Sequence, residues 1–186
     1  MAIISLMTDF GIKDGNTGVM KGVISGIAPD AQIVDLSHMV QPQDIRESAY
    51  ILVRSVPYFP KGTIHVVVVD PGVGTARRPM AARIGDWYYV GPDNGTITLW
   101  LDRAETEKWA CEYVKLDKPK FWLPVVSHVF HGRDIFSPVA AHLARGVPLT
   151  DLGTPFIDPV RLPLPKPEKT ASGWRGEIVH IDHFGN

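Results

Sequence analysis

Three side chains of the sequence, a carboxylate, a guanidinium and an imidazole, are of types that together activate water. Asp70 follows a run of valines and precedes Pro-Gly-Val-Gly, whose glycines permit close approach of the backbone to a ligand. Arg77 lies near enough along the chain to fold back onto Asp70 as an ion-pair partner. Because an arginine keeps its proton, it holds a hydroxide by charge and hydrogen bonding, whereas His131 can take up or relay a proton near neutral pH. The sequence therefore predicts Asp70, Arg77 and His131 as a catalytic group.

Simpler interpretations of the same residues exist. Arg77 and Arg78 are also consistent with a solvated pair on a surface turn, and His131 with a structural histidine at a helix start. A metal site is a further alternative, since imidazoles and a carboxylate occur at short spacing at His128, His131, Asp134, His180 and His183. Their spacing matches no common metal motif, and two histidines three residues apart in a strand or loop need not face one way. We therefore expect no bound metal.

The elements that must position these groups are those of an α/β fold. Apolar β-branched runs alternate with stretches of helical period, a pattern typical of a central, mostly parallel sheet with helices on both faces. Strands are expected at 3–7, 33–36, 64–69, 87–90 and 177–181. Helices are expected at 19–27, where the apolar spacing is Val19, Val23 and Ile27, at 45–56 and at 136–143, and each ends at a proline or glycine.

The chain divides into three parts on these patterns. Residues 1–154 are expected to form one α/β domain, and residues 155–173, which hold five prolines, an extended linker. Residues 174–186 would then form the last strand and the start of a further connection. With 186 residues of which 45% are hydrophobic, the chain is long enough to bury one substantial core.

Polar residues follow four of the expected strands. Asp9 follows the first strand, Asp70 the third, Asp93 and Asn94 the fourth, and Asp182 the fifth. In open α/β sheets, ligands bind beyond the carboxyl ends of the strands, so these groups are predicted to converge on one site. Asp, Asn and Gly are also good turn formers, which explains any one of these positions without a function. Four such turns together favour a binding site.

Composition and charge indicate which partners and which cellular compartment to expect. The formal net charge is −1 and no Lys/Arg run is present, which argues against nucleic acid as a partner. The single cysteine, Cys111, favours a reducing compartment, hence the cytoplasm. The apolar stretch 2–7 has no basic leader and is too short for a signal peptide or a membrane span, so we expect no membrane partner.

Six separated motifs resemble those of the S-adenosylmethionine hydroxide adenosyltransferase family, a former domain of unknown function related to the fluorinase and chlorinase enzymes. They span the chain in the family's order: TDFG at 8–11 with Asp14, VDLSH at 34–38, VDPGVGT at 69–75 with Arg77, GPDNG at 91–95, FHGRD at 130–134 and IDHFGN at 181–186. The resemblance implies a fluorinase-like fold and hydrolysis of S-adenosylmethionine to adenosine and methionine. It implies no cofactor, with S-adenosylmethionine as the substrate, and a homotrimer.

The resemblance also implies roles for individual positions. Asp70, Arg77 and His131 match the family's water-activating triad, and Asp9 matches an aspartate that accepts both ribose hydroxyls. Gly132 matches a position near the reacting C5′, where the halogenating relatives carry a serine. The remaining expected substrate contacts are Asp14 and Asn16, beside Asp9, and Asp182, Phe184 and Asn186, at the methionine end.

The sequence also departs from its relatives. Only residues 84–86 join the stretch 81–83 to Trp87, so the added loop of the fluorinase is absent, and Gln43 stands where the fluorinase has a tryptophan. The β-rich C-terminal domain of family members, which closes over the adenine in a neighbouring subunit, is absent from these 186 residues. A halide-using transferase and a non-catalytic adenosine or S-adenosylmethionine binding module are the alternatives to the hydrolase.

Overall fold

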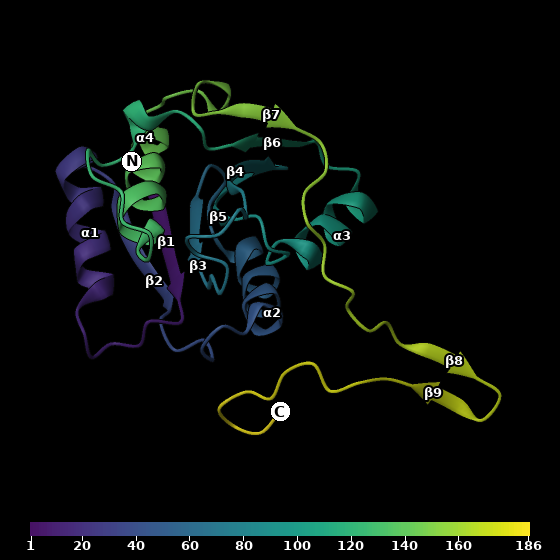
Figure 1. The fold of residues 1–186 in the computed structure, drawn as a ribbon. Helices are drawn as coiled ribbons and strands as arrows, with labels where there is room; N and C mark the ends of the chain where they lie inside the picture. Colours follow the sequence, from purple (N-terminus) through teal and green to yellow (C-terminus); the bar gives the residue numbers. More distant parts are fainter.

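The computed structural model describes residues 1–186 and contains a seven-stranded mixed sheet (Figure 1). Its spatial order is β2-β1-β3-β5-β4-β6-β7. The strands are β1 (Ile3–Thr8), β2 (Gln32–Ser37), β3 (Ile64–Val68), β4 (Pro79–Ile84), β5 (Trp87–Pro92), β6 (Cys111–Lys115) and β7 (Thr154–Phe156). The pairs β2–β1, β1–β3 and β3–β5 are parallel, whereas β4, β6 and β7 extend the sheet with antiparallel pairs. The α/β class and the parallel core are confirmed.

Four of the five expected strands are present, and β4, β6 and β7 were missed. These three strands lie on the antiparallel side, where β4 and β5 form a hairpin that turns at Gly85. Gly85 has a φ of 60°, a left-handed conformation that a glycine adopts without strain. The short 84–86 connection is therefore a tight hairpin turn.

Helices cover both faces of the sheet. One face is covered by α1 (Asn16–Ile27) and α4 (Ser137–Ala144), and the other by α2 (Ile45–Ser55) and α3 (Thr98–Glu107). A π-helical turn, Gly132–Phe136, leads directly into α4. Short 3-10 turns occupy Val56–Tyr58, Pro119–Phe121 and Leu149–Asp151. No helix has both the length and the apolar character that a bilayer crossing requires.

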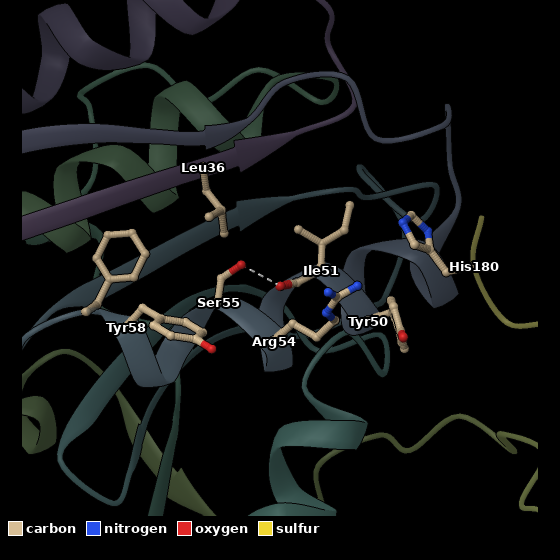
Figure 2. A pocket seen from close by; sticks show the side chains of 8 residues that line it. Leu36, Tyr50, Ile51, Arg54, Ser55, Tyr58 and His180 are labelled. Atoms are coloured by element: carbon tan, nitrogen blue, oxygen red, sulfur yellow. Dashed lines mark hydrogen bonds between the residues drawn. The ribbon is translucent and has the colours of Figure 1, made fainter. Parts of the chain in front are cut away.

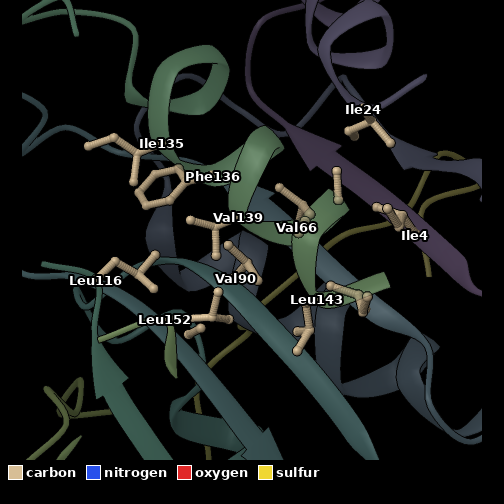
Figure 3. Close-up of a cluster of buried hydrophobic side chains, with 14 of the residues drawn as sticks. Ile4, Ile24, Val66, Val90, Leu116, Ile135, Phe136, Val139, Leu143 and Leu152 are labelled. Carbon is tan, nitrogen blue, oxygen red and sulfur yellow. The ribbon is translucent and has the colours of Figure 1, made fainter. Parts of the chain in front are cut away.

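The valine run of β3 divides its side chains between two buried cores. Val66 and Val68 pack with α1 and α4 in the core drawn in Figure 3, whereas Val67 and Val69 pack with α2 and α3 on the opposite face. Successive side chains of a strand point to opposite faces, so a continuous apolar run is required where both faces are covered. The central strand is thereby held on both sides, which fixes the position of the residues that follow it.

The buried face of α1 differs from the one expected. The helix exists, but Val19 is 46% exposed, whereas Met20 and Ile24 are completely buried. Both faces carry apolar residues at helical spacing, and the sequence pattern alone did not distinguish them. The larger methionine and isoleucine side chains contact α4 and the sheet.

The expected strand at 177–181 is wrong. The chain forms a hairpin of β8 (Glu168–Thr170) and β9 (Gly173–Arg175) within 167–176, and β8 and β9 pair only with each other. Residues 177–181 have no partner strand, and Ile178 and Ile181 are 76% and 65% exposed. This segment instead lies against α2, where Glu177 pairs with Arg46. An apolar alternation without a sheet edge to receive it does not form a strand.

Candidate active site

A cavity of about 250 Å³ lies at the carboxyl ends of β1 and β3. Four segments distant in the sequence form its walls: the loop after β1, the loop before α2, the end of β3 with the loop after it, and the turn that precedes α4. Its lining residues are Asp9, Phe10, Gln43, Val68, Asp70, Pro71, Val73, Val129, Phe130, His131 and Gly132. Of the four strand-end groups that were predicted to converge on one site, Asp9 and Asp70 line this cavity, whereas Asp93 with Asn94 and Asp182 do not.

Asp70, Arg77 and His131 are in direct contact. Arg77 donates from Nε to both carboxylate oxygens of Asp70 at 2.9 Å, and its Nη2 also pairs with Asp70 Oδ2. The same Nη2 lies 2.8 Å from Nδ1 of His131. The Asp70 and Arg77 side chains are only 4% and 9% exposed. Because a buried ion pair is weakly screened, this pair holds a fixed orientation at the cavity wall.

The contact with Arg77 fixes the protonation of His131. A guanidinium has no acceptor, so Nδ1 of His131 must be the bare nitrogen in this bond. Partial burial, and then the positive charge of Arg77, lower the pKa of His131 below its usual value. The imidazole is therefore neutral near pH 7 and carries its proton on Nε2. In this arrangement His131 offers a hydrogen-bond donor, not an acceptor, at its second nitrogen.

Gly74 allows the loop after β3 to reach the loop before α4. Its φ is 76°, and a Cβ atom at this position would lie 2.4 Å from the carbonyl oxygen of His128. Both the left-handed backbone and the close approach require glycine. The short Asp-Pro-Gly-Val-Gly loop is thus what brings Arg77 and His131 together.

The turn that carries His131 and Gly132 has a wider backbone than an α-helix. The π-helical turn of 132–136 is followed by Pro138, which has no N–H to donate to the carbonyl of Asp134. That carbonyl instead accepts the N–H of Leu123 at 2.9 Å. The buried Asp134 carboxylate accepts from the backbone of Ser127 at 2.8 Å and pairs with Arg133 at 2.6 Å. Asp134 therefore closes the loop from Ser127 to Gly132 and has a structural role.

Arg78 points to a different set of partners from Arg77. It pairs with the buried Asp93 at 2.8 Å and with Asp158 at 2.7 Å. Asp93 also accepts the backbone N–H of Val160 at 2.8 Å. The two adjacent arginines are therefore not a solvated surface pair. Arg77 lies behind the cavity wall, in contact with the lining residues Asp70 and His131, whereas Arg78 ties the segment after β7 to the end of β5.

Asp9 lies on the wall of the cavity that the β1 loop forms. Its Oδ2 accepts the backbone N–H of Gln43 at 2.8 Å, whereas Oδ1 has no hydrogen-bond partner within the chain. Gln43 has a φ of 66°, which is rare for a residue with a side chain. Sequence reasoning noted the Gln43 side chain but missed this backbone contact, for which the sequence carries no signal.

Gly132 lines the cavity but lies close to the core. A Cβ at this position would lie 3.2 Å from Val68 Cγ1 and 3.4 Å from the sulfur of Met20. A side chain would therefore press on Val68 and Met20. Phe10 and Phe130, which also line the cavity, form an edge-to-face pair with centroids 5.6 Å apart. Sequence reasoning gave no role to these two aromatic rings, although each lies next to a predicted site residue.

The other predicted substrate contacts are not among the residues that line this cavity. Asp14 and Asn16 are exposed, and Asn16 begins α1. Asp182 accepts the backbone N–H groups of Phe184 and Asn186 at 2.9 and 2.8 Å, and Phe184 is 87% exposed. These three residues form a local turn at the end of the chain.

A second hollow and the histidines of the metal alternative lie apart from the predicted catalytic residues. A larger hollow of about 530 Å³ lies along α2 and is lined by Leu36, Tyr50, Ile51, Arg54, Ser55, Tyr58, Phe59 and His180 (Figure 2). It contains none of the predicted catalytic residues. The histidines of the metal alternative are not brought together, and no three His, Cys, Asp or Glu side chains form a group that could hold a metal ion.

The sequence of this chain is similar to those of known proteins. Residues 4–153 match the family model described as the SAM hydroxide adenosyltransferase N-terminal domain. The (R)-S-adenosyl-L-methionine hydrolase of Salinispora arenicola is 45% identical over 98% of this chain and 69% of that protein. A fluorinase of an Actinoplanes species is 31% identical over 99% of this chain and 70% of that protein.

A solved structure has the same fold. The crystal structure of an uncharacterized conserved protein from Thermotoga maritima superposes with a TM-score of 0.89 at 38% identity. The superposition covers 98% of this chain and 68% of that one. With the family model matching most of the chain and the hydrolase relative matching nearly all of it, this chain belongs to the SAM hydroxide adenosyltransferase family.

Proposed function

We propose that the chain hydrolyses S-adenosylmethionine to adenosine and methionine by attack of water on C5′. The observation that carries the proposal is the Asp70–Arg77–His131 group, in which the buried Asp70–Arg77 pair contacts His131, and Asp70 and His131 line a cavity that also presents Asp9. The water oxygen forms a bond to C5′ as the C5′–sulfur bond breaks. The electron pair of that bond goes to sulfur, which leaves as the neutral thioether of methionine, and the water gives up one proton.

Arg77 is the group that holds the nucleophile. Asp70 occupies Nε and shares Nη2 with His131, so Nη1 remains for the water or the developing hydroxide. Charge-assisted hydrogen bonding stabilises hydroxide more than water, and this difference favours loss of the proton. Asp70 keeps the guanidinium plane in place. Alignment of water with C5′ and sulfur supplies much of the remaining rate enhancement, on the order of 7–11 kcal/mol at best.

His131 takes up or relays the proton through Nδ1. That nitrogen accepts from Arg77 Nη2 in the structure, so it receives the proton only after this hydrogen bond opens. Nη1 holds the hydroxide meanwhile, and Asp70 keeps its bonds to Nε and Nη2. Once protonated, an imidazole with a lowered pKa returns the proton readily to solvent and becomes neutral again.

Asp9 directs the ribose, and Gly132 leaves the approach to C5′ without a hydroxyl group. The free Oδ1 of Asp9 accepts hydroxyl hydrogens from the ligand, as the family resemblance implies. Asp14 and Asn16 would flank the ribose, and Asp182, Phe184 and Asn186 would bind the methionine end. For the last three to reach the same ligand, the end of the chain must move from its place in this structure. We also propose that the protein is a homotrimer, as the family resemblance implies, and that it is cytoplasmic, because its single cysteine favours a reducing compartment.

The source of the 5′ oxygen tests this function. In water enriched in heavy oxygen, the adenosine product should carry the label at its 5′ oxygen, because water is the nucleophile. Adenosine without the label would contradict the displacement. Chloride or fluoride in the assay should give no 5′-halo-5′-deoxyadenosine, and recovery of unchanged S-adenosylmethionine would favour a binding module instead.

A further inference from the structure

The loop before α2 connects a carboxylate on that helix to the cavity. Glu47, in the first turn of α2, accepts the backbone N–H of Gln41 through Oε2 at 2.6 Å. The backbone N–H of Glu47 in turn donates to the carboxylate of Asp44 at 2.9 Å, which caps the helix. These two bonds clamp residues 41–44 from both ends, and the positive end of the helix favours the negative charge of Glu47 there.

The clamped loop has a conformation that it would not adopt alone. Gln43 lies in the left-handed region with a φ of 66°, a conformation that is strained for a residue with a side chain. In this conformation its N–H points to Asp9 and donates at 2.8 Å, while its carbonyl accepts the N–H of Ile45 at 3.1 Å. Something outside Gln43 must offset the strain, and the Glu47 contact to Gln41 is placed to do so.

We propose that Glu47 is a positioning residue for ligand binding by Asp9, an inference that rests on the proposed function. Glu47 holds Gln41, and thereby orients the Gln43 N–H that ties one oxygen of Asp9. The other Asp9 oxygen is then turned toward the cavity for a pair of ligand hydroxyls. Without Glu47, the loop relaxes from the left-handed conformation, Asp9 loses its donor, and its carboxylate samples orientations that do not face the ligand.

The contacts of Glu47 allow it to be replaced without changing the contacts of the catalytic residues. Its side chain is 18% exposed, and its second oxygen lies 3.7 Å from Nδ1 of His180, which stacks on Tyr50 at 5.1 Å. Neither group belongs to the cavity, so replacing Glu47 changes the clamp without touching Asp70, Arg77 or His131. Arg54, two turns along the same helix, contacts Tyr50 but not the loop and offers a matched control.

The experiment compares adenosine with 2′,3′-dideoxyadenosine by calorimetric titration. Glu47→Ala should weaken adenosine about 3- to 10-fold, the effect of one lost hydrogen bond, and leave dideoxyadenosine binding unchanged. With S-adenosylmethionine, KM should rise by a similar factor while kcat stays near that of the wild type. Glu47→Gln should restore binding, because its amide oxygen accepts the same N–H, and Arg54→Ala should match the wild type throughout.

Two outcomes would overturn the inference. Equal weakening of adenosine and dideoxyadenosine by Glu47→Ala would show a general structural defect, and unchanged adenosine binding would show that Asp9 needs no clamp. In both cases the wild-type protein still hydrolyses S-adenosylmethionine, so neither result contradicts the proposed function. A wild-type protein that neither hydrolyses this substrate nor binds adenosine would overturn both proposals.

Discussion

Arg77 and Arg78 are neighbours in the chain but have different roles because of where they lie in the backbone. They immediately precede β4, and successive side chains of an extended segment point to opposite sides. Arg77 turns toward Asp70 and His131, whereas Arg78 turns toward Asp93 and lies 4.3 Å over the ring of Phe156. Substitutions of Arg77 and Arg78 can therefore be compared, since the first contacts Asp70 and His131 and the second has a structural role.

Arg77→Lys should keep the charge yet lose most of the turnover. A compact ammonium cannot reproduce the planar fork that bonds Asp70 and His131 and still presents a donor to water, so kcat should fall about 100-fold or more. Binding of adenosine should change little. The measurement is steady-state kinetics beside Arg78→Lys, which should retain turnover and lose thermal stability. Normal kcat in Arg77→Lys together with impaired kcat in Arg78→Lys would reverse our assignment.

At the scale of the elements, the sequence predicts best where local pattern and burial agree. The valine run of β3 and the Asp70 loop that follows it were both identified, because a fully buried parallel strand must be apolar on both faces. The 177–181 segment has a strand-like composition but no edge to pair with, and no local pattern reports the absence of a partner. The Gln43 N–H is likewise a backbone group whose direction depends on a distant side chain, Glu47.

Strand β3 also carries a buried histidine outside the cavity. His65 is completely buried, accepts or donates one hydrogen bond with Ser5 at 2.7 Å, and packs against the rings of Phe59 and Trp100. Burial lowers the pKa of His65 from 6.5 to about 4. The unfolded chain therefore binds a proton at a pH where the folded protein does not. The resulting stability is fully present above pH 6.5 and is lost as the pH falls toward 4.

Acid should destabilise the wild type more steeply than a His65→Asn variant. A shift from 6.5 to about 4 corresponds to roughly 3 kcal/mol of unfolding free energy lost over that pH range. The free energy of unfolding is measured by urea denaturation at pH 7, 6, 5 and 4.5 for both proteins. Carboxylate titration affects both alike, so the difference in slope isolates His65. Parallel pH dependences would show that His65 is not the group responsible.

At the scale of the whole molecule, the last part of the chain contacts the body at residues 158–162 and again where Glu177 and His180 meet α2. No residue after Leu152 is a member of either buried core, and the segment beyond β7 follows the body through residues 158–162 (Figure 1). There Asp158 pairs with Arg78, and Val160 donates its N–H to Asp93. Leu162 donates its N–H to Thr98 and fills the space that Gly95 leaves. These contacts satisfy polar groups of the body, whereas β8, β9 and residues 176–186 contribute mainly surface contacts.

Two truncations separate those contributions. A chain that ends after Pro165 should unfold within a few degrees of residues 1–186, because it keeps every contact of 158–162. It loses the exposed Arg46–Glu177 pair, worth about 0–1 kcal/mol, and the contacts of His180 with Glu47 and Tyr50. A chain that ends after Phe156 leaves the Asp93 carboxylate, 1% exposed, with Arg78 alone. It also leaves the Thr98 hydroxyl oxygen without the Leu162 N–H as a donor, although that hydroxyl still donates to the Gly95 carbonyl. Unsatisfied buried acceptors cost about 1–3 kcal/mol each, so its Tm should fall by roughly 5 °C or more. The measurement is differential scanning calorimetry of residues 1–186 and of the two truncated chains. Equal Tm values for both truncations would show that the 158–162 contacts do not stabilise the body. A large fall in Tm for the chain that ends after Pro165 would show that the residues beyond it, which include the β8–β9 hairpin, stabilise the body.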